Sequence, residues 1–276
     1  MTPESFNTTM GVVKTIREEL KPTHNIFICE IGGFFMEGLV ISIIALGVIV
    51  TIMFLILRVK KGGLGAMFVK AGASACFIGT AFITFAYNIE KNGFDKQNFE
   101  YGILMLLGFI FSLLGDIWLD LKYVHKECTR PYTYAGFICF MIGHTFFIPA
   151  ILLNFAEYEW WMVPHLIGSC VIFAVVAGLM EKINKNLDYG EFRLITLIYA
   201  LFVAATMFCS INGFFLFGHS KKFLILMIGS VAFVLSDLVL SSIYFEKGKN
   251  TKVNVIINHT LYYLAQFLFA STLLFN

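Results

Sequence analysis

Two aspartates, Asp116 and Asp237, lie inside long apolar stretches that look like copies of each other. The stretches read LMLLGFIFSLLGDIWL and ILMIGSVAFVLSDLVL, and Gly108 and Gly229 keep the same separation as the two aspartates. A carboxylate inside a bilayer costs about 2.5–3.5 kcal/mol on insertion scales, so it is a functional-site hypothesis by default. Two carboxylates at equivalent positions predict one site, built from both halves of the chain, with a pair of acid/base groups.

The segments that must position these carboxylates are apolar enough to span a membrane. Of the 276 residues, 58% are hydrophobic and 14% are charged, whereas a soluble domain has about a quarter of charged residues. A span needs about 20 mostly apolar residues. Eight such segments are predicted: 38–58, 65–87, 101–121, 132–154, 160–180, 192–213, 223–244 and 253–275. We therefore expect an all-α membrane protein, with an N-terminal extension over 1–37 and an eight-span catalytic domain over 38–275, divisible into two parallel four-helix repeats.

The distribution of positive charge predicts the orientation of this bundle. Lysine and arginine are more frequent in the loops that follow odd-numbered spans than on the opposite side. The positive-inside rule places those loops in the cytoplasm and both termini outside. The expected location is the endoplasmic reticulum membrane in a eukaryote and the inner or plasma membrane in a bacterium.

Polar side chains from several spans are predicted to gather in the cytoplasmic half of the membrane. Asp116 and Asp237 lie a few residues before the ends of spans 3 and 7, roughly 7–10 Å deep at 1.5 Å per residue. Candidates for substrate binding or support are Lys70, His144, Tyr199, Ser236, His259, Tyr262, Tyr263 and Gln266. The last four share one helix face by their spacing. Unpaired polar groups are costly in lipid, so a shared, water-accessible pocket near the cytoplasmic leaflet is predicted.

Each candidate also has a purely structural interpretation. Asp116 and Asp237 could form a buried ion pair or helix–helix hydrogen bonds, and Lys70 could extend to the nearby interface. Asp120, one helical turn beyond Asp116, is expected to be solvated at that interface. A stripe of small residues on span 3 is expected to pack against another helix: Gly108, Ser112 and Gly115.

Metal, cofactor and nucleic-acid chemistry are not indicated. A catalytic metal needs three or more converging ligands, whereas His144, His165 and His259 fall at different depths. None of the six cysteines forms a CxxC pair, and a net charge of +2 gives no basis for a nucleic-acid partner. Ser236 and Asp237 are adjacent on a helix and do not face each other, which disfavours a Ser–Asp dyad. We expect no metal and no cofactor, with membrane lipids as partners and the oligomeric state left open.

Taken in order, these motifs resemble the YhhN-type lysoplasmalogenases, a family of eight-span membrane enzymes. The resemblance covers roughly residues 40–272. It rests on Gly115-Asp116 with Leu119, Gly143-His144, Ser236-Asp237 and Tyr262-Tyr263-Leu264-Ala265-Gln266, with Lys70, Tyr199 and Met207 as weaker matches. The chain departs from the family pattern at Ala71, where proline is frequent, and at Phe147, where tyrosine is common.

The resemblance implies hydrolysis of the vinyl ether bond of lysoplasmalogens to a fatty aldehyde and glycerophosphoethanolamine or glycerophosphocholine. It also implies catalysis by two aspartates without a metal. Since apolar neighbours favour a protonated carboxyl, Asp237 is the expected acid and Asp116 the base. Lys70, Lys122 and Arg130 are expected to attract the substrate phosphate. The alternatives are a metal-dependent lipid ester or amide hydrolase of the ceramidase type, and a non-enzymatic lipid transporter or receptor.

Overall fold

The computed structural model of the chain describes residues 36, 38–155, 162–216 and 220–275. The predicted N-terminal extension therefore lies outside the described residues, except for residue 36. The chain divides into two units, Met1–Ile41 and Ser42–Asn276. All of the candidate site residues belong to the second unit.

Long helices occupy all eight segments that were predicted as spans. The first helix covers Gly38–Lys60. The others are α2 (Gly63–Asn92), α3 (Lys96–Val124), α4 (Thr129–Leu153), α5 (Met162–Ile183), α6 (Arg193–Leu216), α7 (Lys221–Phe245) and α8 (Lys252–Ser271). The first helix, α2, α3, α4, α6 and α7 are long and apolar enough to cross a membrane. The prediction of an all-α, multi-pass membrane protein is confirmed, whereas membrane crossing by α5 and α8, and hence the count of eight, stays a prediction.

Side-chain caps and glycines decide where the helices that carry the site begin. The side chain of Asp95 accepts a hydrogen bond of 2.8 Å from a backbone N–H in the first turn of α3, and that of Thr251 accepts one of 3.2 Å in α8. Such caps satisfy N–H groups that have no partner within the helix. Gly62 and Gly63 have φ of 63° and 71°, a left-handed conformation that glycine adopts most easily. They turn the chain from the first helix into α2, so that both helices reach the same end of the bundle.

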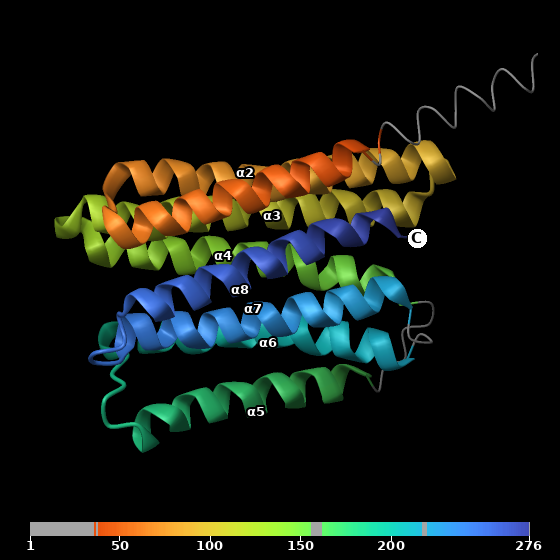
Figure 1. Ribbon diagram of the computed structural model, residues 1–276. Helices are drawn as coiled ribbons and strands as arrows, with labels where there is room; N and C mark the ends of the chain where they lie inside the picture. Colours follow the sequence, from red (N-terminus) through yellow and green to blue (C-terminus); the bar gives the residue numbers. More distant parts are fainter. Residues whose placement is uncertain (1–35, 37, 156–161, 217–219, 276) are drawn as a thin grey trace, which may run out of the picture. The chain divides into compact units, whose positions relative to one another are not determined.

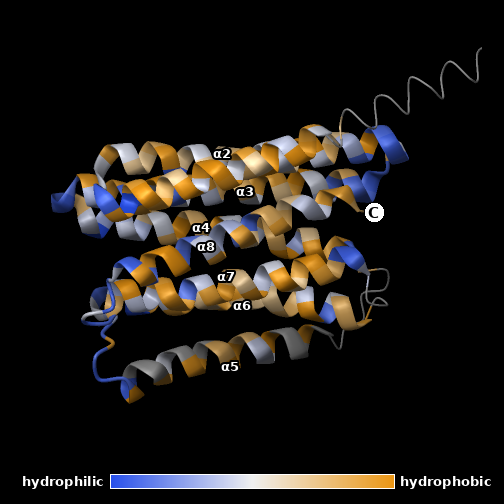
Figure 2. Cartoon of the chain, viewed as in Figure 1, coloured by the Kyte–Doolittle hydropathy of each residue, from blue (hydrophilic) through white to orange (hydrophobic). Residues whose placement is uncertain are grey.

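Six helices of the second unit form a closed ring. The packed pairs are α2–α3, α3–α4, α4–α6, α6–α7, α7–α8 and α8–α2. Helix α5 packs mainly on α6, outside this ring (Figure 1). In ring order α3, which carries Asp116, lies opposite α7, which carries Asp237. Two repeats that each supply one of these helices would give this arrangement. The repeat itself stays a prediction. Hydrophilic residues gather at the two ends of the helices and hydrophobic residues along their length (Figure 2).

The centre of the ring is filled by phenylalanine side chains. Phe77, Phe109, Phe147 and Phe269 follow one another with ring centroids 5.4–5.5 Å apart, and Phe233 lies 6.4 Å from Phe269. All five are fully or almost fully buried. Aromatic pairs at these distances contribute dispersion and favourable ring-edge contacts. These side chains therefore form a packed core at this level, and their contacts fix the rotation of the helices that carry them.

Small residues let α3 and α4 approach each other closely. A Cβ atom added to Gly143 of α4 would lie 3.1 Å from the backbone oxygen of Gly108 in α3. A Cβ added to Gly108 would lie 2.3 Å from the ring of Phe147. Small residues at such crossings allow backbone-to-backbone contact. The predicted packing role of the small-residue stripe on span 3 is confirmed.

Candidate active site

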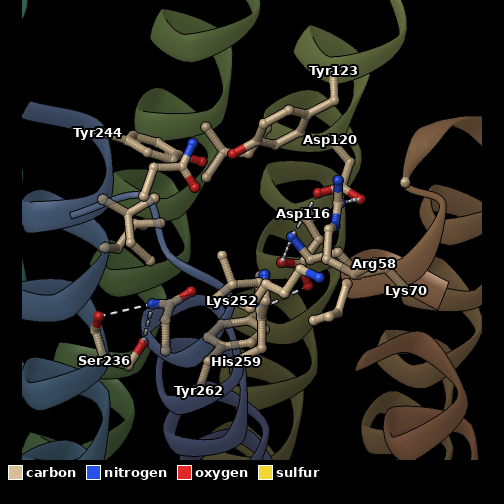
Figure 3. Close-up of a pocket in the computed structure, with 18 of the residues that line it drawn as sticks. Arg58, Lys70, Asp116, Asp120, Tyr123, Ser236, Tyr244, Lys252, His259 and Tyr262 are labelled. Carbon is tan, nitrogen blue, oxygen red and sulfur yellow. Dashed lines mark hydrogen bonds and ion pairs between the residues drawn. The ribbon is translucent and has the colours of Figure 1, made fainter. Parts of the chain in front are cut away.

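A partly open cavity of about 370 Å³ lies at the end of the bundle where the first helix meets α2 and α7 meets α8. Its walls come from the ends of these helices, from α3 and from Phe140 of α4. Six of the ten predicted site residues line it: Lys70, Asp116, Ser236, Asp237, His259 and Tyr262. Figure 3 shows the charged residues of the first helix, α2 and α3 on one side of this cavity and Ser236 on the other. Both aspartates singled out from the sequence therefore face a common space.

Asp116 lies in a dense set of donors. The Lys70 ammonium is 3.0 Å from Asp116 Oδ1. The hydroxyls of Ser74 and Tyr262 donate hydrogen bonds of 2.6 and 2.7 Å to Asp116 Oδ2. Asp116 is 2% exposed and Lys70 is 3% exposed. Lys70 therefore does not extend to the membrane interface, which was the purely structural alternative for this residue. The buried cation and the two hydroxyl donors favour the ionised form of this carboxyl, and they oppose the effect of its burial.

Asp120 is part of the same cluster, contrary to the expectation that it is solvated. One of its oxygens is 3.2 Å from the Lys70 ammonium, and the other accepts from the Arg58 guanidinium. Asp120 is 3% exposed. Its position one turn after Asp116 places both carboxylates on one helix face, where they share Lys70. The four groups carry two positive and two negative charges, so the cluster is neutral as a whole, which lowers the cost of burying it.

Asp237 has different surroundings from Asp116. The Tyr199 hydroxyl donates a hydrogen bond of 2.7 Å to Asp237 Oδ2. Within the described parts of the chain, no basic group lies at ion-pair distance from Asp237. Its neighbours in the cavity wall include Leu240 and Tyr244. Without a nearby cation, an apolar wall favours the neutral acid over the carboxylate.

The remaining wall of the cavity is supplied by α7 and α8. Asn258 donates hydrogen bonds to the backbone oxygen of Ser236 at 2.8 Å and to its hydroxyl at 3.4 Å. This contact ties α8 to α7 beside Asp237. The His259 ring packs edge-on against Phe54 of the first helix, with ring centroids 4.8 Å apart. Ser236 and His259 therefore contribute polar surface to the cavity and also hold its walls together.

Four predicted residues do not line the cavity. Tyr199 donates a hydrogen bond to Asp237 from outside the cavity, and Tyr263 donates one of 3.0 Å to the backbone oxygen of Lys70. Gln266 is fully buried beneath Tyr262, and neither of its amide atoms has a hydrogen-bond partner among the described residues. These residues support the wall from behind.

His144 also lies behind the wall, deeper in the bundle. Its Nδ1 is 2.8 Å from the Thr206 hydroxyl, and its ring packs against Tyr199 and Phe233. Its Nε2 has no partner among the described residues. His144 therefore connects α4 to α6 and α7 and does not reach the cavity.

Two of the three residues expected to attract a phosphate are placed elsewhere. Arg130 is mostly exposed and forms an ion pair of 2.7 Å with Glu191. The Lys122 ammonium lies over the Tyr244 ring, 3.0 Å from its centroid, and does not line the cavity. Long cationic side chains often pack on aromatic faces in this way. Only Lys70 reaches the cavity, and there it is occupied by two carboxylates.

Sequence reasoning missed several residues that shape the site. Ser74 is one turn after Lys70, so the two residues share a helix face. This spacing of four residues could have predicted that Ser74 also faces the site. Arg58, Lys61 and Lys252 line the cavity, but in the sequence they look like ordinary charges flanking spans. Their convergence depends on which helices are neighbours, and no local pattern encodes that.

Among the described residues, no group of three or more His, Cys, Asp or Glu side chains could hold a metal ion. The donors that surround Asp116 and Asp237 are hydroxyls and basic groups, which suit proton transfer and ionic contacts. A protonated carboxyl and an ionised one that face the same water-accessible space can act as acid and base.

The fold and the cavity define a multi-pass helical membrane protein with a charged site at one end of its bundle. The chain belongs to the YhhN family, which matches residues 66–273. All ten predicted site residues fall inside that match, whereas Arg58 and Lys61 precede it. Neither the curated proteins nor the solved structures give a match to this chain.

Proposed function

We propose that this chain is a membrane hydrolase that cleaves the vinyl ether bond of lysoplasmalogens. The observation that carries the proposal is that Asp116 and Asp237 line one cavity in unequal surroundings. Asp116 has a cation at 3.0 Å and two hydroxyl donors, whereas Asp237 has one hydroxyl donor and no described cation in reach. Vinyl ether hydrolysis requires one proton donor and one proton acceptor, and such a pair of environments separates the two roles.

In the first step, Asp237 donates its proton to the β-carbon of the vinyl ether. The double-bond electrons form the new C–H bond and leave an oxocarbenium ion. Asp116 then accepts a proton from a water molecule as the water oxygen bonds to the α-carbon, which gives a hemiacetal. The hemiacetal collapses when its hydroxyl returns a proton to Asp237 and Asp116 protonates the departing ether oxygen. The products are a fatty aldehyde and the glycerophospho alcohol, and both carboxyls regain their starting states.

Asp116 retains room for a water molecule in this scheme. An ionised carboxyl has about four acceptor positions, and Lys70, Ser74 and Tyr262 occupy three of them. The remaining position on Oδ1 is available for the attacking water. The negative charge of Asp116 also stabilises the oxocarbenium ion electrostatically, as a carboxylate does in glycoside hydrolysis.

The substrate phosphate is expected at the cavity mouth. Lys61 and Lys252 line the cavity, are exposed, and form no ion pair with a described residue. Arg58 Nε is buried and has no hydrogen-bond partner among the described residues. Two solvated ammonium groups and one guanidinium N–H suit a phosphodiester. In this proposal they replace Lys122 and Arg130 as the headgroup contacts.

We propose that the site lies near the cytoplasmic leaflet. The cavity opens at the end of the bundle that carries the loops rich in lysine and arginine, and the positive-inside rule supports this orientation. The membrane would be that of the endoplasmic reticulum in a eukaryote, or the inner or plasma membrane in a bacterium.

The experiment that tests this function is aldehyde release from a synthetic lysoplasmalogen by purified protein in detergent, with and without a chelator. Asp116→Asn and Asp237→Asn should each lower turnover by at least about 10²-fold, the scale of a lost acid or base. Glu100→Gln, an exposed carboxyl at the start of α3, is the matched control and should behave like the wild type.

Each other outcome points to a different function. Near-normal turnover in either aspartate variant, at equal expression, would overturn the two-carboxylate mechanism. Loss of activity with chelator would favour a metal-dependent hydrolase of the ceramidase type. No aldehyde from a folded, monodisperse protein, together with lipid flux in liposomes, would favour a transporter.

A further inference from the structure

A second, apolar pocket meets the polar cavity at Asp237. It lies between α5, α6 and α7 and has a volume of about 60 Å³. Its walls include Phe173 of α5, Ala200 and Val203 of α6, and Val234 of α7. It shares three lining residues with the polar cavity: Asp237, Leu240 and Tyr244. The two spaces are therefore neighbours with a common wall, and Asp237 lines both of them.

We infer that this apolar pocket binds the first carbons of the hydrocarbon chain of the substrate. The inference rests on the proposed function and extends it to the placement of the substrate. A lysophospholipid has a charged headgroup at one end and an apolar chain at the other. The polar cavity suits the first part, and the apolar pocket suits the second, because apolar chains gain free energy when they leave water. The bond between the two parts then lies at the common wall.

This placement gives Asp237 the role of proton donor. The carbon that accepts the proton in vinyl ether hydrolysis is the second carbon of the chain, on the pocket side of the ether oxygen. Asp237 borders the pocket, whereas Asp116 lines only the polar cavity. The proton donor and the chain therefore lie on one side, and the base with its water lies on the other. The geometry supports the same assignment as the difference in charge around the two carboxyls.

The size of the pocket limits what it can recognise. Roughly 10–15 Å³ of such space accommodates one water-sized group, so a pocket of about 60 Å³ holds only a handful of methylene groups. Leu238 lines the pocket and is 52% exposed on the outer surface of the bundle. The rest of a long chain therefore continues among the membrane lipids. We expect strong selection for an apolar chain and weak selection among long chain lengths.

The test compares two substrates that differ only in their chain, a hexadecenyl lysoplasmalogen and an ethenyl one that has no carbon beyond the reacting double bond, with the variant Ala200→Phe. The added ring fills the pocket, so kcat/KM for the long chain should fall about tenfold more than kcat/KM for the short chain. This is the scale of one or two methylene groups excluded from an apolar site. Ile198→Phe, on the lipid-facing side of α6, is the matched control and should leave the ratio of the two substrates unchanged. An equal fall for both substrates, or no fall, would overturn the inference.

A second measurement does not depend on turnover. A lysophospholipid with a non-hydrolysable alkyl ether and a diazirine on its first chain carbons is photolysed with the wild-type protein. Cross-links should map by mass spectrometry to α6 and α7 around Val203 and Val234, and Ala200→Phe should weaken them. Cross-links confined to other helices would overturn the inference. If the protein cross-links there but releases no aldehyde, the proposed reaction fails while the chain pocket stands.

Discussion

The Lys70 ammonium lies 3.0 Å from the Asp116 carboxylate, and both side chains are almost completely buried. Lys70 also lies 3.2 Å from Asp120, whose other oxygen accepts from Arg58. The charge of each group is therefore balanced by a partner from another helix. This arrangement joins the first helix, α2 and α3 at the floor of the cavity, and its cations favour the ionised form of Asp116 against the effect of burial.

Removing one partner of this cluster is expected to destabilise the protein. Lys70→Met leaves Asp116 buried without a cation, which costs about 3–5 kcal/mol for a buried pair. The melting temperature in detergent should fall accordingly, and Lys91→Met, an exposed lysine on the same helix, should change it little. The double variant Lys70→Met/Asp116→Asn removes both charges and should melt above the single lysine variant. A double variant less stable than both single variants would contradict the ion-pair interpretation.

The hydrogen bond from Tyr199 to Asp237 is expected to matter for turnover. Tyr199→Phe keeps the ring packed against Phe137 and His144 and removes only the donor. A hydrogen bond of this kind contributes about 0.5–1.5 kcal/mol, so kcat should fall by up to about tenfold with KM nearly unchanged. Tyr134→Phe removes a hydroxyl that donates to a backbone oxygen at the surface and should leave kcat unchanged. Equal rates for the two variants would show that Tyr199 does not orient the acid.

The lysines at the cavity mouth are predicted to act on substrate binding and not on chemistry. Lys61→Ser and Lys252→Ser should each raise KM severalfold and leave kcat close to the wild-type value, since they remove an interaction made equally in the ground and transition states. The wild-type KM should rise with salt, because exposed charges are screened over about 8–10 Å at 0.1–0.15 M ionic strength. Lys126→Ser, in the short 3-10 helix between α3 and α4 and outside the cavity wall, is the control. A fall in kcat at constant KM would argue against a headgroup contact.

The close contact between α3 and α4 gives a prediction on stability alone. Gly143→Ala places a methyl group 3.1 Å from the Gly108 backbone oxygen, and overpacking of this kind typically costs about 1–3 kcal/mol. Gly65→Ala, where an added Cβ meets nothing within 4 Å, should be neutral or stabilising, because alanine has a higher helix propensity than glycine. Melting temperatures of the two variants in one detergent decide the matter. Equal melting temperatures would show that α3 and α4 can move apart to accommodate the methyl group without a loss of stability.

Much of the fold was predictable because hydropathy is a local property of the chain. The segment predicted over 223–244 is the helix Lys221–Phe245, and that over 65–87 lies within Gly63–Asn92. Helix α8 is less apolar than the others because it carries His259, Tyr262 and Gln266. The same polar residues that weaken its hydropathy signal made it recognisable as a helix of the site.

By itself, the sequence determined that Asp116 and Asp237 are exceptional, because a carboxylate in an apolar span is costly wherever the span lies. Only the tertiary structure decided which groups meet them. Arg58 reaches Asp120, and Tyr199 reaches Asp237, because the helices are ordered in a ring and each is rotated by contacts such as that between Gly143 and Gly108. Those rotations result from packing between residues far apart in the chain, and a pattern along a single helix carries no record of them.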